Sequence, residues 1–287
     1  METAATLERA DAKTLRCLEI WGGNRATDSG VAMPGIDAWI LSRPFAGSEF
    51  GGDVYYVSLC GGHKLARFAV ADISGHGPQA DRVAELLRRL VRKHIGTLDQ
   101  TRFLQTLNNE FASLAAAGTY ATALLASYYA PIDHLVVCNA GHPKPLWYHA
   151  GTGAWEYLEH ASPKCVRNLA NLPLGIVHLT RYHQFAVPLE KDDVVLIYTD
   201  ALLDARDPQG RELGEEGLLR LVRQNGMQAP DVFCRSLLDA VTAHRAGAAL
   251  EDDITVMLLH HNASDPPRIS AADVARYAGA ILGLVRV

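Results

Sequence analysis

The sequence has few of the features that mark secreted proteins, proteins that bind zinc through cysteines, or membrane proteins. Its five cysteines are odd in number and scattered, and no two of them form a C-x-x-C pair. This argues against a disulfide framework or a thiolate zinc site, and a reducing cytoplasm is the expected location. The N-terminal segment lacks the basic start and the apolar block of a secretory signal. No apolar run approaches the roughly 20 residues that span a bilayer, so no membrane association is expected.

A surplus of basic residues is absent as well. The chain has 27 Lys and Arg against 32 Asp and Glu, which gives a formal net charge of −5. A general nucleic-acid binder needs a basic surface to neutralise phosphates, so no nucleic-acid partner is expected. What the 287 residues do have, with 48% hydrophobic and 21% charged side chains, is the composition of a soluble globular protein with a sizeable core.

The order of the apolar patterns indicates the fold class. Runs of β-branched and aromatic residues between turn residues predict strands at 54–59, 65–73, 121–129, 135–139, 145–149, 155–158, 182–187, 194–198 and 254–260. Apolar residues at helical spacing predict helices at 78–91, 103–114, 215–223 and 230–244. Strands in runs with helices in pairs favour antiparallel sheets covered by helices over a βαβ array.

The two ends of the chain are expected to flank one domain at 36–262. Residues 1–20 place Leu7, Leu15, Leu18 and Ile20 among charges. They predict an N-terminal helix that docks a partner or a second copy of the chain, or else a loosely attached leader. Residues 21–36 are rich in Gly, Asn and Asp and are expected to be irregular, which completes a leader at 1–35. Residues 160–180 are interpreted as a long loop, and 271–284 as a helix within a C-terminal segment at 263–287.

Aspartates stand at the ends of the predicted strands. Asp53 directly precedes the run 54–59, and Asp72 lies near the end of the run 65–73. Residues 60–63 form a plausible hairpin turn, so these two aspartates should be neighbours. Asp200 follows the run 194–198, and Asp252 and Asp253 open the run 254–260. Antiparallel pairing of those two strands would bring these acids together in the same way.

Such a gathering of carboxylates predicts a cation site. Like charges at contact distance repel by about 1–4 kcal/mol per pair, so a compensating positive charge is expected. Oxygen ligands without Cys or His suit Mg²⁺ or Mn²⁺ better than Zn²⁺. The alternative is that each aspartate is only a strand-end turn residue. Asp192 and Asp193 also precede a strand but have no partner at that end, and they are interpreted as a solvated turn.

Six short motifs match one family in order. They are Gly51-Gly52-Asp53-Val54-Tyr55, Ala71-Asp72-Ile73-Ser74-Gly75-His76-Gly77, Asn139-Ala140-Gly141-His142-Pro143, Leu172-Pro173-Leu174-Gly175, Tyr198-Thr199-Asp200 and Asp252-Asp253-Ile254-Thr255. Together they span about residues 50–260 and resemble the signatures of the SpoIIE/RsbU-like branch of the PPM (protein phosphatase 2C-like) phosphatases. The resemblance implies an α+β fold in four layers (α-β-β-α), a sandwich of two antiparallel β-sheets flanked by helices.

The resemblance also implies a function and its residues. It implies hydrolysis of phosphoserine or phosphothreonine in a protein by a water that two Mn²⁺ or Mg²⁺ ions activate, in a bacterial partner-switching pathway. The substrate in this branch is often a small anti-anti-sigma (STAS) domain. By motif, Asp72 bridges the two ions, Asp53 and the backbone carbonyl of Ile73 hold one, Asp200 and Asp252 hold the other, and Asp253 supports them or is a weak extra ligand.

Other positions leave alternatives open. His76 is the candidate to protonate the leaving seryl oxygen or to hold a bound water, and ordering the 75–77 turn is its other interpretation. His142 is expected to shape a turn. No arginine is an obvious phosphate clamp, and Arg43 and Lys144 are the candidates. An activating protein partner is expected to act through the helices at 78–91 and 103–114.

Two alternative functions are considered, one because of Ala201 and one because of the Gly51-Gly52-Asp53 motif. The family usually has Gly after its third aspartate, but this chain has Ala201, whose Cβ could strain the turn. A catalytically silent PPM-fold binding or regulatory module is therefore the main alternative. Gly51-Gly52-Asp53 also resembles part of the G-G-D-E-F signature of nucleotide cyclases. Val54 stands where that motif has an acid, which argues against a cyclase.

Overall fold

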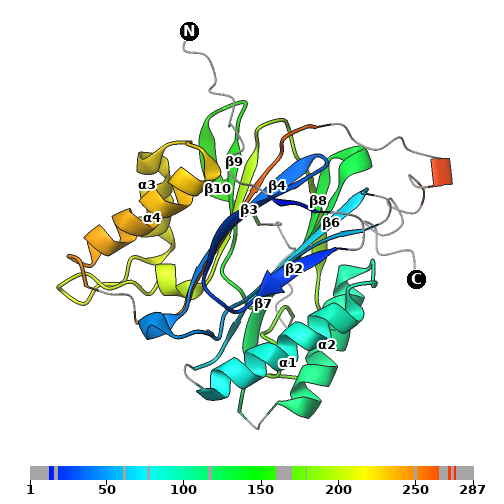
Figure 1. Ribbon diagram of the computed structural model, residues 1–287, viewed down its shortest axis with the longest axis horizontal. Helices are drawn as coiled ribbons and strands as arrows, with labels where there is room; N and C mark the ends of the chain where they lie inside the picture. Colours follow the sequence, from blue (N-terminus) through cyan, green and yellow to red (C-terminus); the bar gives the residue numbers. More distant parts are fainter. Residues whose placement is uncertain are drawn as a thin grey trace.

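The computed structural model describes residues 13–15, 19–60, 63–75, 78–115, 118–159, 170–178, 180–248, 251–264, 271–272 and 275. Two stacked β-sheets lie at the centre, with a pair of helices on each outer face (Figure 1). This is the predicted four-layer α+β sandwich. The expected loop at 160–180 lies in large part outside the described residues, as does the expected helix at 271–284.

The sheets have seven and six strands. The seven-stranded sheet runs in the order β1 (Lys13–Thr14), β3 (Thr27–Met33), β4 (Ile36–Arg43), β13 (Ile254–His260), β12 (Val194–Tyr198), β9 (Leu146–His149) and β10 (Ala154–Tyr157). The six-stranded sheet runs in the order β11 (Gln184–Pro188), β8 (His134–Ala140), β7 (Ala121–Tyr129), β6 (Leu65–Ile73), β5 (Val54–Cys60) and β2 (Ile20–Gly23). Among the described strands, the pairing of β1 with β3 is parallel and the others are antiparallel.

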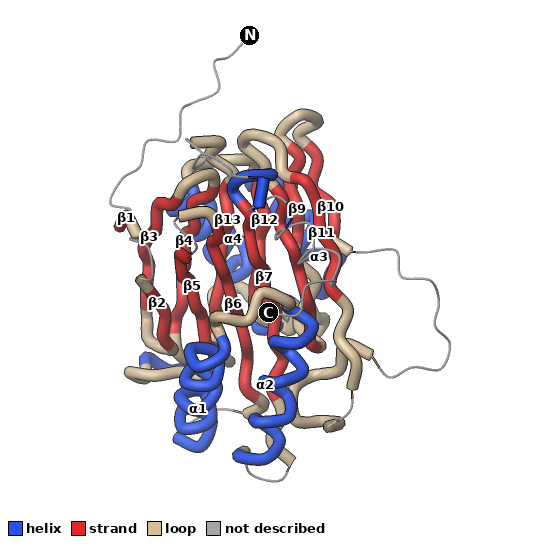
Figure 2. Tube along the Cα trace, turned by 90° about the vertical axis from the view of Figure 1, so that its right-hand side faces the viewer, coloured by secondary structure: helices blue, strands red, loops and turns tan. Residues whose placement is uncertain are grey.

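Each helix pair covers one sheet. Helices α1 (Pro78–His94) and α2 (Gln100–Leu114) pack side by side against the six-stranded sheet (Figure 2). Helices α3 (Gly214–Asn225) and α4 (Pro230–His244) cover the seven-stranded sheet. Asp99 caps α2 by accepting hydrogen bonds from the backbone N–H groups of Thr101 and Arg102. Three large apolar cores result, one between the sheets and one under each helix pair, and Leu65, Tyr129 and Val136 form a small separate cluster.

The N-terminal expectations are wrong where the structure describes them. Residues 13–14 and 20 belong to strands rather than to a helix, and the stretch expected to be irregular forms β2, β3 and the start of β4. Partners distant in sequence decide these strands: β2 pairs with β5, and β13 pairs with β4. Such pairing overrides weak local propensity. Residues 1–12 lie outside the described part of the chain, and the domain division at 36 and 262 stays a prediction.

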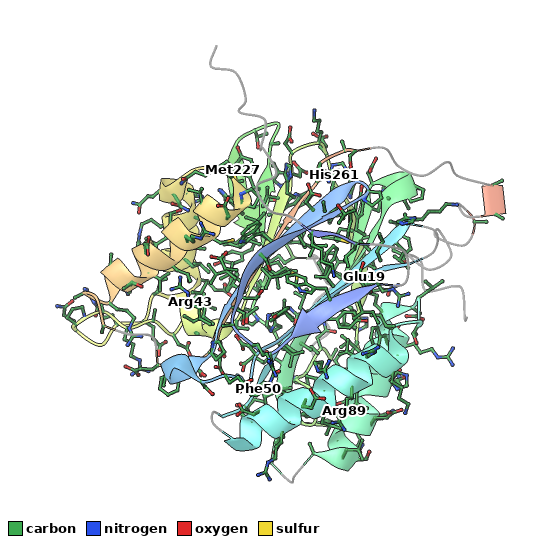
Figure 3. All side chains as sticks on the ribbon, viewed as in Figure 1. Glu19, Arg43, Phe50, Arg89, Met227 and His261 are labelled. Atoms are coloured by element: carbon green, nitrogen blue, oxygen red, sulfur yellow. The ribbon has the colours of Figure 1, made fainter. Side chains whose placement is uncertain are left out.

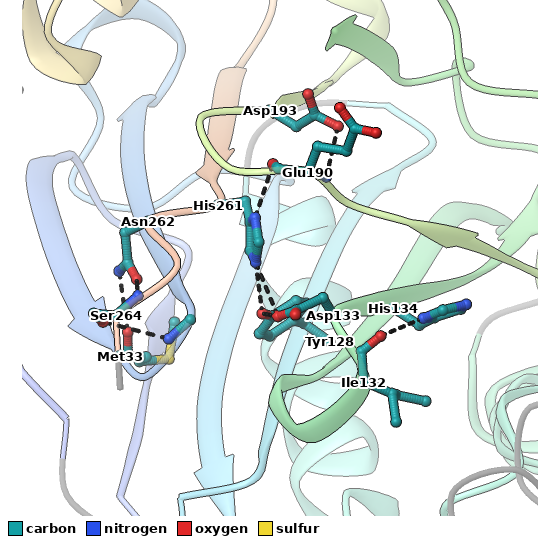
Figure 4. Close-up of polar contacts among 11 residues, drawn as sticks. Met33, Tyr128, Ile132, Asp133, His134, Glu190, Asp193, His261, Asn262 and Ser264 are labelled. Atoms are coloured by element: carbon teal, nitrogen blue, oxygen red, sulfur yellow. Dashed lines mark hydrogen bonds and ion pairs between the residues drawn. The ribbon is translucent and has the colours of Figure 1, made fainter. Parts of the chain in front are cut away.

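One end of the sandwich is closed by a polar network around the buried side chains of Tyr128 and His261, shown in Figure 4. The His261 ring lies 2.8 Å from the Glu190 carbonyl through Nδ1, and its Nε2 lies 3.0 Å from Asp133 Oδ1. Tyr128 Oη donates to the same carboxylate oxygen at 2.6 Å. Because Tyr128 lies near the end of β7 and His261 follows β13, these contacts join the two sheets.

The interpretation of Asp193 as a solvated residue is wrong. Its side chain is buried and accepts hydrogen bonds from Trp147 Nε1 and from the backbone N–H groups of Ala150 and Glu190. The carboxylate therefore closes the turn before β12 from inside. Asp193 does have partners at this end, but they are the Trp147 indole and two backbone N–H groups, which the sequence pattern does not reveal. Within the described residues, no helix is both long and apolar enough to cross a membrane.

Candidate metal centre

The two predicted antiparallel strand pairs are confirmed, and they gather the aspartates at the other end of the sandwich. Strands β5 and β6 pair with Val54 opposite Ala71, which places Asp53 beside Asp72. Strands β12 and β13 pair with Tyr198 opposite Val256, which brings Asp200 towards Asp252. We call this end, with these four aspartates, the metal edge. Figure 3 shows Arg43 and Phe50, which flank it in β4 and before β5, on the side opposite His261.

The Asp253 carboxylate is held by hydrogen bonds from the backbone around the metal edge. Its Oδ1 accepts a hydrogen bond from the Phe45 N–H at 2.7 Å, and its Oδ2 accepts one from the Gly52 N–H at 2.6 Å. A Cβ on Gly51 would stand 2.6 Å from Asp253 Oδ1, so only glycine leaves room for this carboxylate. This explains the glycine pair before Asp53. It also favours the supporting role for Asp253 over direct metal ligation.

Asp53 is oriented by a threonine that the sequence did not single out. Thr199 Oγ1 donates to Asp53 Oδ2 at 2.9 Å and accepts from the Thr255 N–H at 2.9 Å. The contact joins the two sheets, since Asp53 precedes β5 and Thr199 follows β12. The other oxygen, Asp53 Oδ1, is buried and accepts no hydrogen bond from the described residues. A signal existed, because Thr199 and Thr255 both stand within motifs.

Asn24 is a second missed residue. It is buried, and it lies in the segment expected to be irregular. Its side-chain Nδ2 donates to the Gly51 carbonyl at 3.0 Å, and its backbone carbonyl accepts from the Gly51 N–H at 2.8 Å. These two bonds fix the chain that leads into Asp53. A lone asparagine outside any motif gave no signal for this role.

The carboxylates of the metal edge make each other's charged form less stable. Burial, and then the neighbouring carboxylates of Asp53, Asp200, Asp252 and Asp253, raise the pKa of Asp72 to about 9. Burial also raises the pKa of Asp53 well above its usual range, with Asp253 and Asp252 adding to it. The pKa of Asp200 is raised by burial, and then by Asp204 and Asp252. A bound cation would favour the charged form of all three.

The residues present fit a hard divalent cation. Asp53 Oδ1 is a buried oxygen that accepts no hydrogen bond from the described residues, and the side chains near it are carboxylates. The Ile73 carbonyl oxygen is also close, because it lies 3.5 Å from the position that a Cβ on Gly52 would take. Oxygen atoms of both kinds are ligands for hard divalent cations. In the described part of the chain, no three Asp, Glu, His or Cys side chains are close enough together to enclose an ion as they stand. The carboxylates are thus within electrostatic reach of one another rather than in a closed ligand shell.

The backbone accommodates Ala201 without strain. Asp200 opens a 3₁₀ helix, η3 (Asp200–Leu202), and its carbonyl accepts from the N–H groups of Leu203 and Asp204. Ala201 is buried against the core under α3 and α4, and it is not among the described residues with positive φ. A glycine is therefore not required by the backbone at this position.

Two motifs pack together beside the metal edge. Asn139 closes the turn of the first by accepting from the His142 N–H and donating to the His142 carbonyl. Gly141 has φ of +69°, and a Cβ there would overlap Pro173 of the second motif. Burial lowers the pKa of His142 to about 3, and its Nδ1 lies 2.9 Å from Thr122 Oγ1, on the residue opposite Asp72. These contacts agree with a role for His142 in shaping the turn.

Three candidates are placed differently. His76 lies outside the described residues, so its proposed role stays a prediction. Lys144 is paired with Glu159 at 3.2 Å and with Glu215 at 3.6 Å. Arg43 is exposed at the end of β4, opposite Ile254.

Comparison with known proteins agrees with this architecture. The sequence profile of Stage II sporulation protein E (SpoIIE) matches residues 62–262. The phosphoserine phosphatase RsbU of Bacillus subtilis (strain 168) is 22% identical over 250 residues, which cover 84% of this chain and 69% of RsbU.

Two solved structures share the fold. The RsbU and RsbW domains of a Mycobacterium tuberculosis protein superpose with a TM-score of 0.68 at 24% identity, covering 88% of this chain and 70% of that one. The catalytic domain of the serine/threonine phosphatase PstP, in complex with two manganese ions, superposes with a TM-score of 0.54 at 14% identity, covering 78% of this chain and 97% of that one. The α+β PPM fold is thereby confirmed. Since the family profile spans more than half of the chain, this protein belongs to the SpoIIE family of PP2C-like phosphatases, in its RsbU-like branch.

Proposed function

We propose that the chain is a metal-dependent protein serine/threonine phosphatase that hydrolyses phosphoserine or phosphothreonine in a partner-switching pathway of a bacterial cytoplasm. The observation that carries the proposal is the buried, unpartnered Asp53 Oδ1 among carboxylates with raised pKa values. Family membership and the phosphatase names of the relatives support the same reaction class.

The proposed ligands of two Mn²⁺ or Mg²⁺ ions are Asp53, Asp72, Asp200, Asp252 and the Ile73 carbonyl. When bound, two such ions supply an activated water for in-line attack and neutralise charge on the phosphoryl oxygens. The chain's own groups hold this arrangement in place. Thr199 fixes one oxygen of Asp53, which leaves the other free for a cation.

Two further residues, Asp253 and His76, complete the proposed arrangement. Asp253 ties the backbones of Phe45 and Gly52 to the metal edge, which fixes the approach to Asp53. His76 is proposed to protonate the leaving seryl oxygen.

The test is hydrolysis of p-nitrophenyl phosphate and of a phosphoserine protein with Mn²⁺. We expect activity in the wild type and none in Asp200→Asn, whose folded state is checked by circular dichroism. Wild-type activity no greater than that of an Asp72→Asn control would refute the enzyme and favour the silent binding module. The unstrained backbone at Ala201 is the observation that speaks against silence.

The proposed protein partners are a phosphorylated anti-anti-sigma (STAS) domain as substrate and an activating protein that acts through α1 and α2. Helix α1 begins five residues after Ile73, and Ala80 lies 3.6 Å from where a Gly52 Cβ would stand. A shift of α1 would therefore reach the metal edge directly. Hydrogen exchange that stays unchanged in both helices on partner binding would count against this route. Pairing with a second copy of the chain stays a prediction.

A further inference from the structure

A cavity of about 270 Å³ lies beside the metal edge, and apart from Asp252 its lining has no part in the proposed chemistry. Its lining includes Asp204, Arg206, Arg245, Glu251 and Asp252. Ala201, the neighbour of Asp200, also contributes to its wall. A group bound in the cavity would therefore lie next to the phosphoester at the metal edge.

Arg245 is the unusual residue of this cavity. It follows α4, and its side chain is only 6% exposed. Its Nη2 donates to Glu251 Oε1 at 2.9 Å, but its Nε is buried and has no hydrogen-bond partner among the described residues. A buried guanidinium is costly unless its N–H groups are satisfied. The Nε and Nη2 groups form the edge that binds an oxyanion through two parallel hydrogen bonds.

The present partner of Arg245 is easily exchanged. The Glu251 side chain is 85% exposed, and an ion pair with such a partner contributes little to stability. Arg206, the other arginine of the cavity, is engaged by Glu212 at 2.7 Å. Arg245, with an exposed partner and an Nε that lacks a hydrogen bond, is therefore the arginine of the cavity that an incoming anion would bind.

The charge of the cavity selects among anions. Asp204, Glu251 and Asp252 already contribute negative charge, which disfavours a doubly charged free phosphate more than a singly charged carboxylate. A singly charged carboxylate would replace one carboxylate on Arg245 by another and would add the contact that Nε lacks. The fitting ligand is thus an aspartate or glutamate side chain.

We propose that this cavity is a subsite for an acidic residue that neighbours the phosphoserine of the protein substrate, and that Arg245 determines this specificity. The inference rests on the proposed function, because the position of the cavity matters when the phosphoester lies at the metal edge. It adds a substrate preference to the reaction and an arginine to the site.

The test uses the full chain with Mn²⁺ and pairs of phosphoserine peptides. Within each pair a single Asp, placed at one of three positions on either side of the phosphoserine, is replaced by Asn. The readout is the ratio of kcat/KM for the Asp peptide to that for the Asn peptide, so a general loss of rate cancels. For the wild type we expect a ratio of about ten at one position or more, which corresponds to about 1.4 kcal/mol.

Four variants separate the explanations. Arg245→Met should bring the ratio to about one, and Arg245→Lys, which keeps the charge, covers the case in which the Met variant does not fold. Glu251→Gln removes the competing carboxylate and should raise the ratio. The matched control is Arg235→Met, because Arg235 lies on α4 but is exposed and pairs with Asp28 and Asp231. It should keep the wild-type ratio.

A ratio of one at every position in the wild type overturns the proposal, as does a ratio that survives in both Arg245 variants. Equal losses of rate on both peptides in Arg245→Met and Glu251→Gln, with weaker Mn²⁺ binding in calorimetry, would mean that the pair only positions Asp252. A wild type that hydrolyses nothing refutes the proposed function instead. The subsite is then judged by equilibrium binding of the same peptides, where the Asp peptide should bind about tenfold more tightly to the wild type but not to Arg245→Met.

Discussion

The glycine before Gly52 offers a quantitative test of how the metal edge is held together. In Gly51→Ala the new Cβ would stand 2.6 Å from Asp253 Oδ1, whereas ordinary contact begins at 3.4 Å, so the carboxylate must retreat by about 0.8 Å. That movement breaks or stretches its hydrogen bonds to the N–H groups of Phe45 and Gly52, now 2.7 and 2.6 Å long. Hydrogen bonds to a charged acceptor contribute about 1.5–3 kcal/mol each, so losing both lowers the free energy of unfolding by about 3–6 kcal/mol.

The assay is a double-mutant cycle by urea denaturation in EDTA. Asp253→Ala alone should cost a similar amount, because it removes the same two bonds. In the Asp253→Ala background, Gly51→Ala should cost less than about 1 kcal/mol, since the group that it displaces is gone. Gly96→Ala is the control, because a Cβ there meets nothing within 4 Å. Additive effects of the two substitutions would refute the explanation of the glycine.

Three further predictions address the site and its support. Mn²⁺ at 100 times its dissociation constant should stabilise the wild type by about 2.7 kcal/mol in thermal unfolding, and Asp200→Asn should lose most of this gain; equal gains in both would remove Asp200 from the ligand set. Without metal, the folded protein holds a proton on Asp72 up to about pH 9 that the unfolded chain releases near pH 4, so the free energy of unfolding should fall as pH rises between these values. Asp72→Asn should flatten that slope, and a slope unchanged in the variant would contradict the assignment. Gly141→Ala combines positive φ with overlap on Pro173 and should cost about 2–5 kcal/mol in denaturant unfolding, against a negligible cost for Gly96→Ala.

The parts of the fold that local pattern determines could be predicted. Residues 65–73, 121–129, 194–198, 230–244 and 254–260 have the predicted type and the predicted bounds. Each combines an apolar period with turn residues at its ends. Strand β2 (Ile20–Gly23) has neither, and a Cβ on Gly22 would stand 2.5 Å from the Tyr55 carbonyl oxygen. Gly22 allows the backbone of β5 to come close, and this requirement can be recognised only when the positions of both strands are known.

The candidate site also has residues that the sequence predicts and residues that it does not. Asp53 and Asp72 could be found because their strand ends and their hairpin are local features. Asp200 and Asp252 also stand at strand ends, but α3 and α4 separate their strands in sequence, and the family motifs assign them to the same site. The groups that hold the aspartates could not be found, since their partners are distant in sequence: Asn24 is 27 residues from Gly51, and Thr199 is 146 residues from Asp53. A sequence also does not show which backbone N–H groups reach a side chain, and two of the three donors to Asp193 are of this kind. The pattern therefore predicts a solvated residue where the structure has a buried one.

Three consecutive acids before β13 show why a charged cluster of this kind can fold. Glu251 bonds to Arg245, and Asp253 accepts two backbone N–H groups from Phe45 and Gly52. Asp252 Oδ1 accepts the N–H of Asp253 at 2.8 Å, and its charge acts on Asp72 and Asp200, whose pKa values it helps to raise. An asparagine at 252 keeps an oxygen that accepts this hydrogen bond and removes the repulsion, whereas an asparagine at 253 keeps only one of the two oxygens that accept N–H groups. Neutralising Asp253 should consequently damage the fold with or without metal, whereas neutralising Asp252 should harm only the metal-bound state. Comparing urea unfolding of Asp253→Asn and Asp252→Asn in EDTA and in Mn²⁺ tests this division, and a loss of metal-free stability in Asp252→Asn equal to that in Asp253→Asn would refute it.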